Sequence, residues 1–566
     1  MLDMSMVFTI IHGVFMEGAM FFRVKKAGDR TYFQIVENRW QDGRSKQRVI
    51  CTLGRLDELE ASGQLDRLIS SGAKFSESMM VIDAHRRGDA PVIGVRRIGP
   101  GMIFERLWRE TGLREIIEHL VAGRKFEFPV ERAVFVTVLN RLFAPGSDRF
   151  CSKWVQDYGI AEADDLDLHH LYRAMAWLGE ELPEAQQAGR TLAPRCVKDL
   201  IEEELFFRSR DLFSALDLVF FDTTSIYFEG EGGETLGERG HNKDHRPDLK
   251  QMVVGAVIDN QGHPICCEMW PGNTADVTSL VPVVDRLRSR FSLGQVCIVA
   301  DRGMISADTI KELEKRQWPY ILGARMRLVK EVRQEVLSRA GRYQVVNASR
   351  SPLKVKEVVV DGRRYVVCVN EDQAKKDALD RAAIIAALEE KLKQGDKSLV
   401  GNKGFRKYLA STARGFAIDH EKAKAESRFD GKWVLRTNTS LPAAELGLKY
   451  KQLWMVEQIF RSAKTLLSTR PVYHQCDRTI RGHVFCSFLA LVLRRALQER
   501  LEAKELRCEW ADIKLELDSL TEVELEHGGK RFLVRSLPKG VCNAVFRAVG
   551  VAFPPTIRNV PFDATA

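Results

Sequence analysis

The segment from Leu216 to Arg325 constrains the fold of this chain more than any other part of the sequence. Its apolar runs and amphipathic stretches follow the order strand, strand, strand, helix, strand, helix, strand. In sequence these are LDLVFFDTTSIYF, KQMVVGAVID, HPICCEMW, ADVTSLVPVVDRLRSRF, QVCIVAD, SADTIKELEKRQ and PYILGAR. Three adjacent strands followed by alternation with helices predict an α/β fold, in which a mixed sheet carries an antiparallel meander at one side.

Composition supports a folded protein of several domains. The 566 residues are 45% hydrophobic and 29% charged, with only 18 Pro and 41 Gly, which excludes collagen-like and disordered chains. The 11 Cys contain no C-x-x-C pair, so neither a disulfide framework nor a zinc ribbon is indicated, and a reducing compartment is expected.

The sequence predicts a cytoplasmic protein with no membrane association. The longest apolar run, Phe485 to Leu493, is about half the length of a spanning helix, and it is expected to be a buried helix. Asp3 lies where a signal peptide needs positive charge. Residues 1 to 19 are interpreted as a tail or as the product of an upstream start.

Positive charge is concentrated in one region. Residues 325 to 440 contain 26 Lys and Arg against 15 Asp and Glu, whereas the formal net charge of the whole chain is only +9. A concentrated basic region is typical of a protein that binds a polyanion, since each neutralised phosphate releases a counterion. A solvated charged surface is the alternative interpretation.

The pattern divides the chain into six regions. Asp-Gly between two alternating runs predicts a β-hairpin near the N-terminus, and helical spacing dominates from about Pro100 to Phe207. The predicted regions are an N-terminal β-containing module (20–95), a helical region (96–210), the first part of the α/β core (211–325), a basic β-rich insertion (326–440), a helical return to the core (441–506) and a C-terminal extension (507–566).

Two aspartates follow buried strands. Asp222 ends the run LDLVFFD and Asp301 ends QVCIVAD, and each is followed by small or polar residues. An acid at the carboxyl end of a buried strand lies at the sheet edge where open α/β folds bind ligands. Each alone has a plain alternative, a cap of the following turn or helix.

A third acid, Glu457, lies in the predicted helix YKQLWMVEQIFRSAKTLL. Tyr450, Leu453, Glu457 and Lys464 stand at i, i+3, i+7 and i+14, which predicts that they share one helix face. The apolar neighbours of Glu457 predict a largely buried helix, in which an acid needs a partner.

These segments resemble the DDE transposases of bacterial insertion sequences, in particular superfamily four and its close relatives. That family has Tyr, two residues, Arg, three residues, Glu, six residues and Lys; this chain matches at Tyr450, Glu457 and Lys464 but has Leu453 in place of Arg. The stretches FFDTTSIYFEG, GHNKDHRPDLKQMVVGAVIDNQGHPI, VADRGM and VYHQCDRTIRGHVFCSFLALVL are also similar to it.

The resemblance implies an RNase H-like catalytic core interrupted by the β-rich insertion. Asp222, Asp301 and Glu457 would be the catalytic and metal-binding acids, separated by 79 and 156 residues. Three carboxylates suit Mg²⁺ or Mn²⁺ rather than zinc, and a pair of ions about 3.5 to 4 Å apart is expected. Such a site performs in-line phosphoryl transfer on DNA.

A second group of residues is predicted to bind DNA. Lys464 would hold a phosphate with Tyr450 nearby, and Arg461 would take the place of the missing arginine at Leu453. A polar cluster between the first two core strands, which the family also carries, would contact phosphate or support the acids. Its members are His241, Lys243, His245 and Arg246.

The predicted function is therefore that of a DNA transposase, an endonuclease and strand-transferase. It would bind terminal inverted repeats, cleave the element ends and join the 3′-hydroxyl ends to target DNA. Its predicted partners are double-stranded DNA and a second copy of the chain in a synaptic complex, and it would act at the bacterial nucleoid. A metal-dependent nuclease on the same core and a non-catalytic DNA-binding protein derived from a transposase are the two alternatives.

Overall fold

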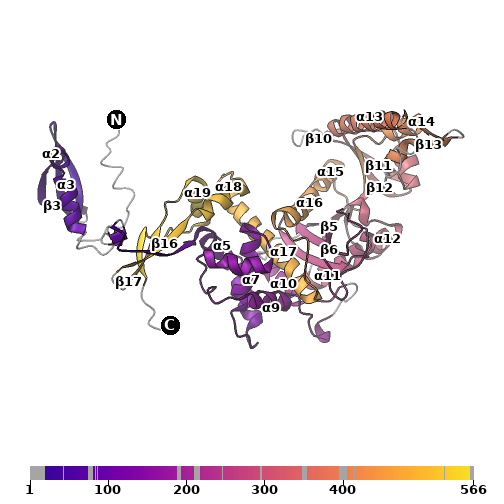
Figure 1. Cartoon of the computed structure of the whole chain (residues 1–566). Coiled ribbons are helices and arrows are strands. Elements are labelled where there is room, and N and C mark those ends of the chain that lie inside the picture. The colour runs from indigo at the N-terminus through magenta and orange to yellow at the C-terminus, as the bar shows by residue number, and fades with distance from the viewer. Residues whose placement is uncertain are drawn as a thin grey trace. The chain divides into compact units, whose positions relative to one another are not determined.

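The structure is a computed structural model, and it divides the chain into two units that are described separately (Figure 1). It describes residues 20–560 except 42–43, 74–80, 83, 86, 188–192, 210–216, 242, 245, 293–295, 347–352, 394–404, 413–414 and 528–529. One unit contains Met1–Val95, Thr521–Leu537 and Pro554–Ala566; the other contains Arg96–Leu520 and Pro538–Phe553.

The first unit begins with a three-stranded antiparallel sheet. Strands β1 (Met20–Ala27), β2 (Arg30–Gln41) and β3 (Arg44–Arg55) pair in chain order. The predicted hairpin is confirmed, because Gln41 pairs with Arg44 across the turn, whose two residues lie outside the described part of the chain. Helices α2 (Leu56–Ala61) and α3 (Gln64–Ala73) follow.

The first unit also contains a sheet built from both ends of the sequence. Its strands lie in the order β18 (Ile557–Val560), β17 (Lys530–Arg535), β16 (Thr521–His527) and β4 (Val92–Arg97). Buried Val81, Leu525 and Phe532 form a small core with them. The C-terminal segment therefore folds with the N-terminal region, an arrangement that sequence periodicity does not reveal.

The second unit opens with the predicted helical region. Its elements are α5 (Gly99–Glu110), α6 (Leu113–Val121), α7 (Val130–Phe143), α8 (Asp148–Trp154), η1 (Val155–Asp157), α9 (Leu168–Leu178), η2 (Glu184–Gln186) and α10 (Val197–Arg208). Helix α7 is buried along its whole length, which explains its apolar sequence VERAVFVTVLNRLF.

A mixed nine-stranded sheet forms the centre of the second unit. The order of its strands is β10-β11-β12-β15-β9-β8-β5-β6-β7. Strands β5 (Leu218–Tyr227), β6 (Gln251–Asp259) and β7 (Pro264–Pro271) form the predicted antiparallel meander. Helix α11 (Asp276–Phe291), β8 (Cys297–Ala300), η3 (Arg302–Met304), α12 (Ala307–Lys315) and β9 (Tyr320–Ala324) then follow in the predicted alternation.

Both faces of this sheet are covered. On β5, Leu218 and Phe220 belong to the core shared with the helical region, whereas Val219 and Phe221 belong to the core shared with α11 and α12. Burial on both faces explains why the strand is an unbroken apolar run instead of an alternating one. The same alternation directs Asp222 to the face of Phe220.

The basic segment extends the central sheet. Strands β10 (Gln344–Val346), β11 (Leu353–Val360), β12 (Arg363–Asn370) and β15 (Lys432–Thr437) continue it from β9. Asp361 and Gly362 both have positive φ, which forms the tight turn between β11 and β12. The π-helix η4 (Val332–Val336) precedes these strands.

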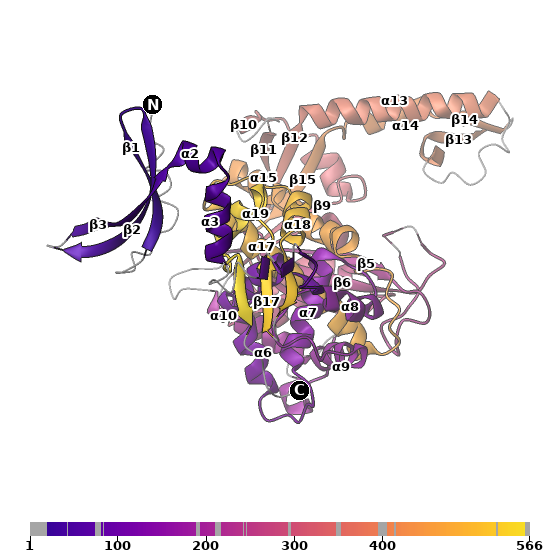
Figure 2. The ribbon, with the colours of Figure 1, turned by 60° about the vertical axis from the view of Figure 1, so that its left-hand side comes forward.

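A smaller group of elements lies between β12 and β15. The long helix α13 (Glu371–Lys393) contacts η6 (Phe405–Tyr408) and the two-stranded sheet of β13 (Leu409–Thr412) and β14 (Gly415–Ile418), with α14 (His420–Ser427) beside it (Figure 2). Leu388, Tyr408 and Ala423 form its small core.

The chain then returns to helices. These are α15 (Ala443–Lys451), α16 (Trp454–Arg461), the π-helix η7 (Ser462–Leu466), α17 (Asp477–Glu502), α18 (Trp510–Asp518) and α19 (Gly540–Val549). The apolar run Phe485–Leu493 lies in α17 and is almost entirely buried, as predicted. Within the described residues, none of the helices combines the length and apolarity that crossing a membrane requires.

His263 ties the β6–β7 turn to α17. Its Nδ1 lies 2.8 Å from Asp259 Oδ2, and its Nε2 bonds Glu499. Burial opposes protonation, but the bonds to Asp259 and Glu499 outweigh it and raise the pKa of His263 to about 9. A raised pKa means that the imidazolium stabilises the fold fully below pH 6.5 and that this contribution is lost as pH rises through about 9.

We expect His263→Ala to lower the free energy of unfolding by about 1 to 2 kcal/mol at pH 7, a value reduced for solvent screening because both side chains are partly exposed. Chemical denaturation at pH 7 and pH 10 measures this, and the loss should shrink at pH 10. The exposed His420 provides the control variant, His420→Ala. A loss that is equal at both pH values would contradict the ion-pair role.

Candidate active site

Asp222 lies in the middle of β5. The expectation that it ends the strand is wrong, because β5 continues for five residues beyond it, paired with β6 as far as Tyr227. Thr223, Thr224 and Ile226 are β-branched and favour this extension. Strand β8, however, pairs with β5 only as far as Phe221, so the sheet edge on that side does lie beside Asp222.

Asp301 directly follows β8 at this edge. Ala300 pairs with Phe221 in parallel register, so Asp301, the residue after β8, lies next to Asp222 on β5. Asp301 has an extended backbone and begins the short helix η3. Arg325 fixes this turn by donating to the carbonyls of Arg302 (2.9 Å) and Gly303 (2.8 Å).

The Asp222 carboxyl group is buried and lies near other charged groups. Burial raises its pKa to about 6; Lys243 opposes the shift, while Asp301 and Asp276 add to it. Its Oδ1 accepts a local bond from the Thr223 amide at 2.7 Å. Without a cation, ionising Asp222 next to other carboxylates is unfavourable.

Tyr450 holds the second aspartate. Its hydroxyl donates to Asp301 Oδ1 at 3.0 Å, and burial together with Asp301 raises the pKa of Tyr450. Gly323 on β9 permits this approach, because a Cβ there would overlap the Tyr450 hydroxyl. The sequence predicted Tyr450 as a DNA contact, and the structure gives it a hydrogen bond that orients Asp301.

We expect Tyr450→Phe to slow DNA cleavage by about three- to tenfold, because Asp301 loses a hydrogen bond that fixes its carboxylate while the ring still fills its place. Single-turnover cleavage of labelled DNA measures the rate. Binding of the same DNA should stay unchanged. A large loss of binding with unchanged cleavage of bound DNA would instead make Tyr450 a DNA contact.

The predicted continuous helix around Glu457 is interrupted. Helix α15 ends at Lys451, α16 begins at Trp454, and the turns from Ser462 are π-helical. The predicted single face is therefore wrong: Leu453 is buried in the core, whereas Glu457 is exposed. Burial of Leu453 also explains an apolar residue at that position.

Glu457 nevertheless lies on an element that borders the two aspartates. Helix α16 packs against β5 and β6 (Figure 1). Among the described residues, the sets of three or more metal-ligating side chains whose ligand atoms lie within 4.8 Å of one another do not include Asp222, Asp301 and Glu457. The structure thus brings Asp222 and Asp301 together and leaves Glu457 exposed on the neighbouring helix.

The predicted DNA-binding residues on the same helices differ in their surroundings. Lys464 is largely buried and donates to Asp244 Oδ1 at 2.8 Å, and burial lowers its pKa, partly offset by Asp244. Arg470 binds the other Asp244 oxygen at 2.7 Å. Arg461, at the end of α16, is exposed.

Three of the four residues in the polar cluster predicted between β5 and β6 lie in the described part of the chain. His241 is exposed. Arg246 pairs with Asp248 at 2.8 Å and lies over the Tyr227 ring. His245 lies outside the described residues. Lys243 is the member that reaches the acids, and its Nζ donates to the carbonyl and hydroxyl of Thr223 at 2.8 and 2.9 Å.

Sequence reasoning missed Asp276. It begins α11, and its Oδ1 accepts from the Thr223 hydroxyl at 2.7 Å while its Oδ2 lies 3.1 Å from Lys243 Nζ. A Cβ built on Gly303 would lie 3.9 Å from Asp276 Oδ2 and 4.0 Å from Asp301 Oδ2, so both acids border the same turn. The available signal was an Asp at the start of a helix that follows a core strand, which normally indicates only a favourable helix dipole.

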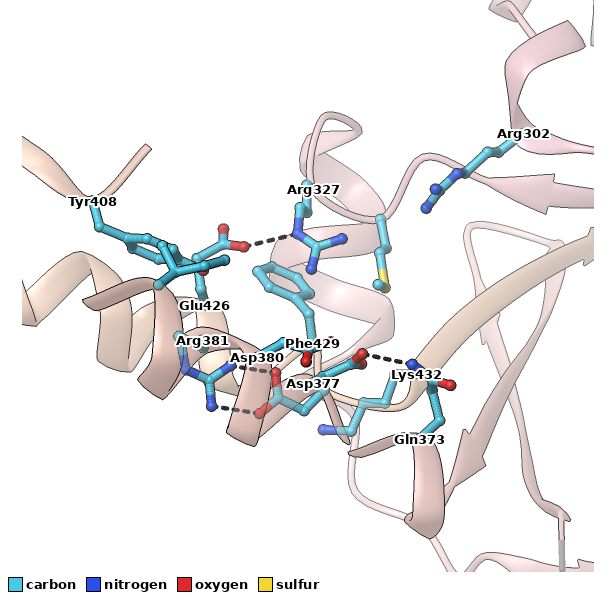
Figure 3. Close-up of a pocket in the computed structure, with 13 residues that line it drawn as sticks. Arg302, Arg327, Gln373, Asp377, Asp380, Arg381, Tyr408, Glu426, Phe429 and Lys432 are labelled. Atoms are coloured by element: carbon cyan, nitrogen blue, oxygen red, sulfur yellow. Dashed lines mark hydrogen bonds and ion pairs between the residues drawn. The ribbon is translucent and has the colours of Figure 1, made fainter. Parts of the chain in front are cut away.

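A cavity of about 390 Å³ opens beside this turn, between Arg302 and the α13–α14 region (Figure 3). Two of the arginines that line it are paired with acids that also line it. Arg381 binds both oxygens of Asp430 at 2.5 and 2.6 Å, and Arg327 binds Glu426 at 2.9 Å. Arg302, the residue after Asp301, points toward the cavity (Figure 3).

A buried histidine cluster lies elsewhere in the unit. Asp148, His474 and His483 are close enough to share a metal ion. However, an Arg141 nitrogen lies 2.9 Å from His483 Nδ1, and burial together with Arg141 lowers the pKa of His483 to about 3. The guanidinium occupies the ligand atom, so the cluster is a hydrogen-bonded junction of α7, α8 and α17.

The donors at Asp222 and Asp301 fit a hard divalent cation. They are carboxylate oxygens, the ligands that Mg²⁺ and Mn²⁺ prefer. Burial raises the pKa of Asp222, with smaller contributions from Asp301 and Asp276, and a bound cation would favour the ionised carboxylate.

Comparison with known proteins adds independent evidence. Residues 214–493 match the transposase DDE domain, and residues 22–84 match the N-terminal domain of IS1634 family transposases. A comparison with curated proteins gave no match.

Among solved structures, a piggyBac transposase synaptic complex with hairpin DNA is similar at 10% identity. The match covers 74% of this chain and 76% of that one, with a TM-score of 0.36. The two family matches span the N-terminal strands and the sheet with Asp222 and Asp301, and the chain belongs to the DDE transposases of insertion sequences.

Proposed function

We propose that this transposase binds the terminal inverted repeats of its element, cleaves DNA at the element ends and joins the 3′-hydroxyl ends to target DNA. The observation that carries the proposal is the placement of Asp222 and Asp301 side by side at the end of β8, inside the segment that matches the DDE domain. We propose Glu457 as the third acid and an RNase H-like core as the fold.

The chemistry follows from the residues at this edge. When bound, a pair of divalent cations would activate a water or a 3′-hydroxyl and stabilise the leaving oxygen. Asp222 and Asp301 would hold these cations, and Tyr450 would keep the Asp301 carboxylate in one orientation. Glu457, exposed on α16 beside β5, would complete the site.

Double-stranded DNA is the proposed substrate. The 325–440 segment has 26 Lys and Arg against 15 Asp and Glu and continues the sheet beyond Asp301, where it would lie along the DNA near the cut. Arg461, His241, His245 and Arg246 are proposed phosphate contacts. We propose that the N-terminal module and the helical region recognise the repeats and that two copies hold the two ends together.

The test is a cleavage and joining assay with full-length protein and linear DNA that carries the element ends. We expect Mg²⁺- or Mn²⁺-dependent nicks that expose 3′-hydroxyl ends. Pre-cut ends with a free 3′-hydroxyl should be joined to a plasmid target. Cleavage without joining would identify a nuclease instead, and binding to the ends without either reaction would identify a DNA-binding protein.

A further inference from the structure

We propose that Asp276 is a positioning residue that holds the Lys243 ammonium group against β5 beside Asp222. A fixed positive charge then opposes the acids and tunes how tightly they hold divalent cations. This inference rests on the proposed metal-dependent function and adds two residues to it.

The contacts of Lys243 form a closed set. Its Nζ donates to the Thr223 carbonyl at 2.8 Å and the Thr223 hydroxyl at 2.9 Å, and lies 3.1 Å from Asp276 Oδ2. An ammonium group has three donors, so all three are used within the protein. Contact with a DNA phosphate would require Lys243 to give up one of them.

Asp276 completes this arrangement from a different element. Its other oxygen, Oδ1, accepts a hydrogen bond from the Thr223 hydroxyl at 2.7 Å. The Asp276 carboxylate therefore binds both Lys243 and Thr223. The Lys243 amide also donates to Ser225 Oγ at 2.8 Å, which fastens the loop to β5. Among the described residues, Asp276 is the acid that forms an ion pair with this ammonium group.

The Lys243 ammonium group lies near Asp222, and its charge should therefore affect cation binding there. Thr223 follows Asp222 on the strand, and Lys243 Nζ lies 2.8 Å from the Thr223 carbonyl, so the positive charge is held at the residue next to Asp222. Like charges a few ångströms apart weaken cation binding. Lys243 should therefore reduce the affinity of the site for a divalent cation, and only while Asp276 holds it there.

The experiment measures Mn²⁺ binding to the full-length, DNA-free protein by electron paramagnetic resonance of free Mn²⁺. We expect Lys243→Met to tighten Mn²⁺ binding on the order of tenfold. In an Asp276→Asn background the same Lys243→Met change should alter the affinity by less than about twofold. Asp248→Asn is the matched control, because it removes a salt bridge of Arg246 in the same loop and should change nothing.

Three outcomes would overturn the inference. Equal tightening in both backgrounds would show that Asp276 does not position the ammonium. An unchanged affinity in Lys243→Met would place the charge outside the field of the acids. A loss of about 100-fold or more in Asp276→Asn alone would make Asp276 a ligand.

The proposed function fails separately from this inference. If Asp222→Asn and Asp301→Asn bind Mn²⁺ as the unmodified protein does, the metal-dependent function is wrong and the inference falls with it. If both weaken binding but the Lys243 and Asp276 variants behave independently, only the inference is wrong.

Discussion

Asp222→Asn and Asp301→Asn should each reduce DNA cleavage by about 10³-fold or more, and Glu457→Gln should do the same. Each change removes a charged oxygen from a site whose proposed work is to hold cations against the reacting phosphate. Amides are close in shape to the acids, so binding of the element ends should persist. Single-turnover cleavage and gel-shift binding on the same DNA separate the two effects.

The stability of the metal-free Asp222→Asn variant provides a second test of the role of Asp222. The pKa of Asp222 is raised to about 6, so above pH 6 the metal-free folded state carries an unfavourable carboxylate. Asp222→Asn should therefore be at least as stable as the unmodified protein at pH 7.5 without metal, although it is inactive. Thermal unfolding measures this, and Asp308→Asn, at a 90% exposed side chain, is the matched control.

If one of the three substitutions does not reduce cleavage, the conclusion depends on which residue was changed. A cleavage rate within tenfold of normal for Glu457→Gln alone would mean that a different residue supplies the third acid. The same result for Asp222→Asn or Asp301→Asn would remove the catalytic site from this edge of the sheet altogether.

The central sheet was predictable because its signal is local. Each core strand is an apolar run bounded by turn residues, and the crossover through α11 from β7 makes β8 run parallel to β5, with which it pairs. That pairing alone brings Asp222 and Asp301 together. The apolar run of β5 stops at Asp222, but the strand continues because the polar residues Thr223 and Thr224 that follow are β-branched.

The helix with Glu457 was harder to predict because tertiary packing overrides periodicity there. The sequence from Tyr450 to Lys464 has uninterrupted helical spacing, yet Leu453 packs into the core at the junction of two helices. The pairing of Lys464 with Asp244 joins residues 220 positions apart, and the Asp276–Lys243 contact likewise crosses from a helix to a loop. Such long-range ion pairs leave no periodic signal.

Replacing Arg290 should strongly destabilise the second unit, because this residue lies in a buried charge cluster. Its guanidinium is 3% exposed and lies 2.9 Å from Asp199, 2.5 Å from Glu202 and 2.8 Å from Glu203. Arg290→Met would leave these acids short of a cation. Removing one partner of a buried ion pair costs about 3 to 5 kcal/mol, and denaturant unfolding of the full chain measures the loss.

The charge cluster around Arg290 also helps to position Asp276 at the candidate active site. Arg290 lies near the end of α11 and Asp276 at its start, so the contacts with α10 anchor the helix that presents Asp276 beside β5. Burial raises the pKa of Glu202 despite Lys198 and Arg290, so Glu202→Gln added to Arg290→Met should restore part of the lost stability. Arg288→Met, two residues away on the exposed face of α11, should cost less than about 0.5 kcal/mol. Equal losses in Arg288→Met and Arg290→Met would show that the cluster does not hold α11 in place.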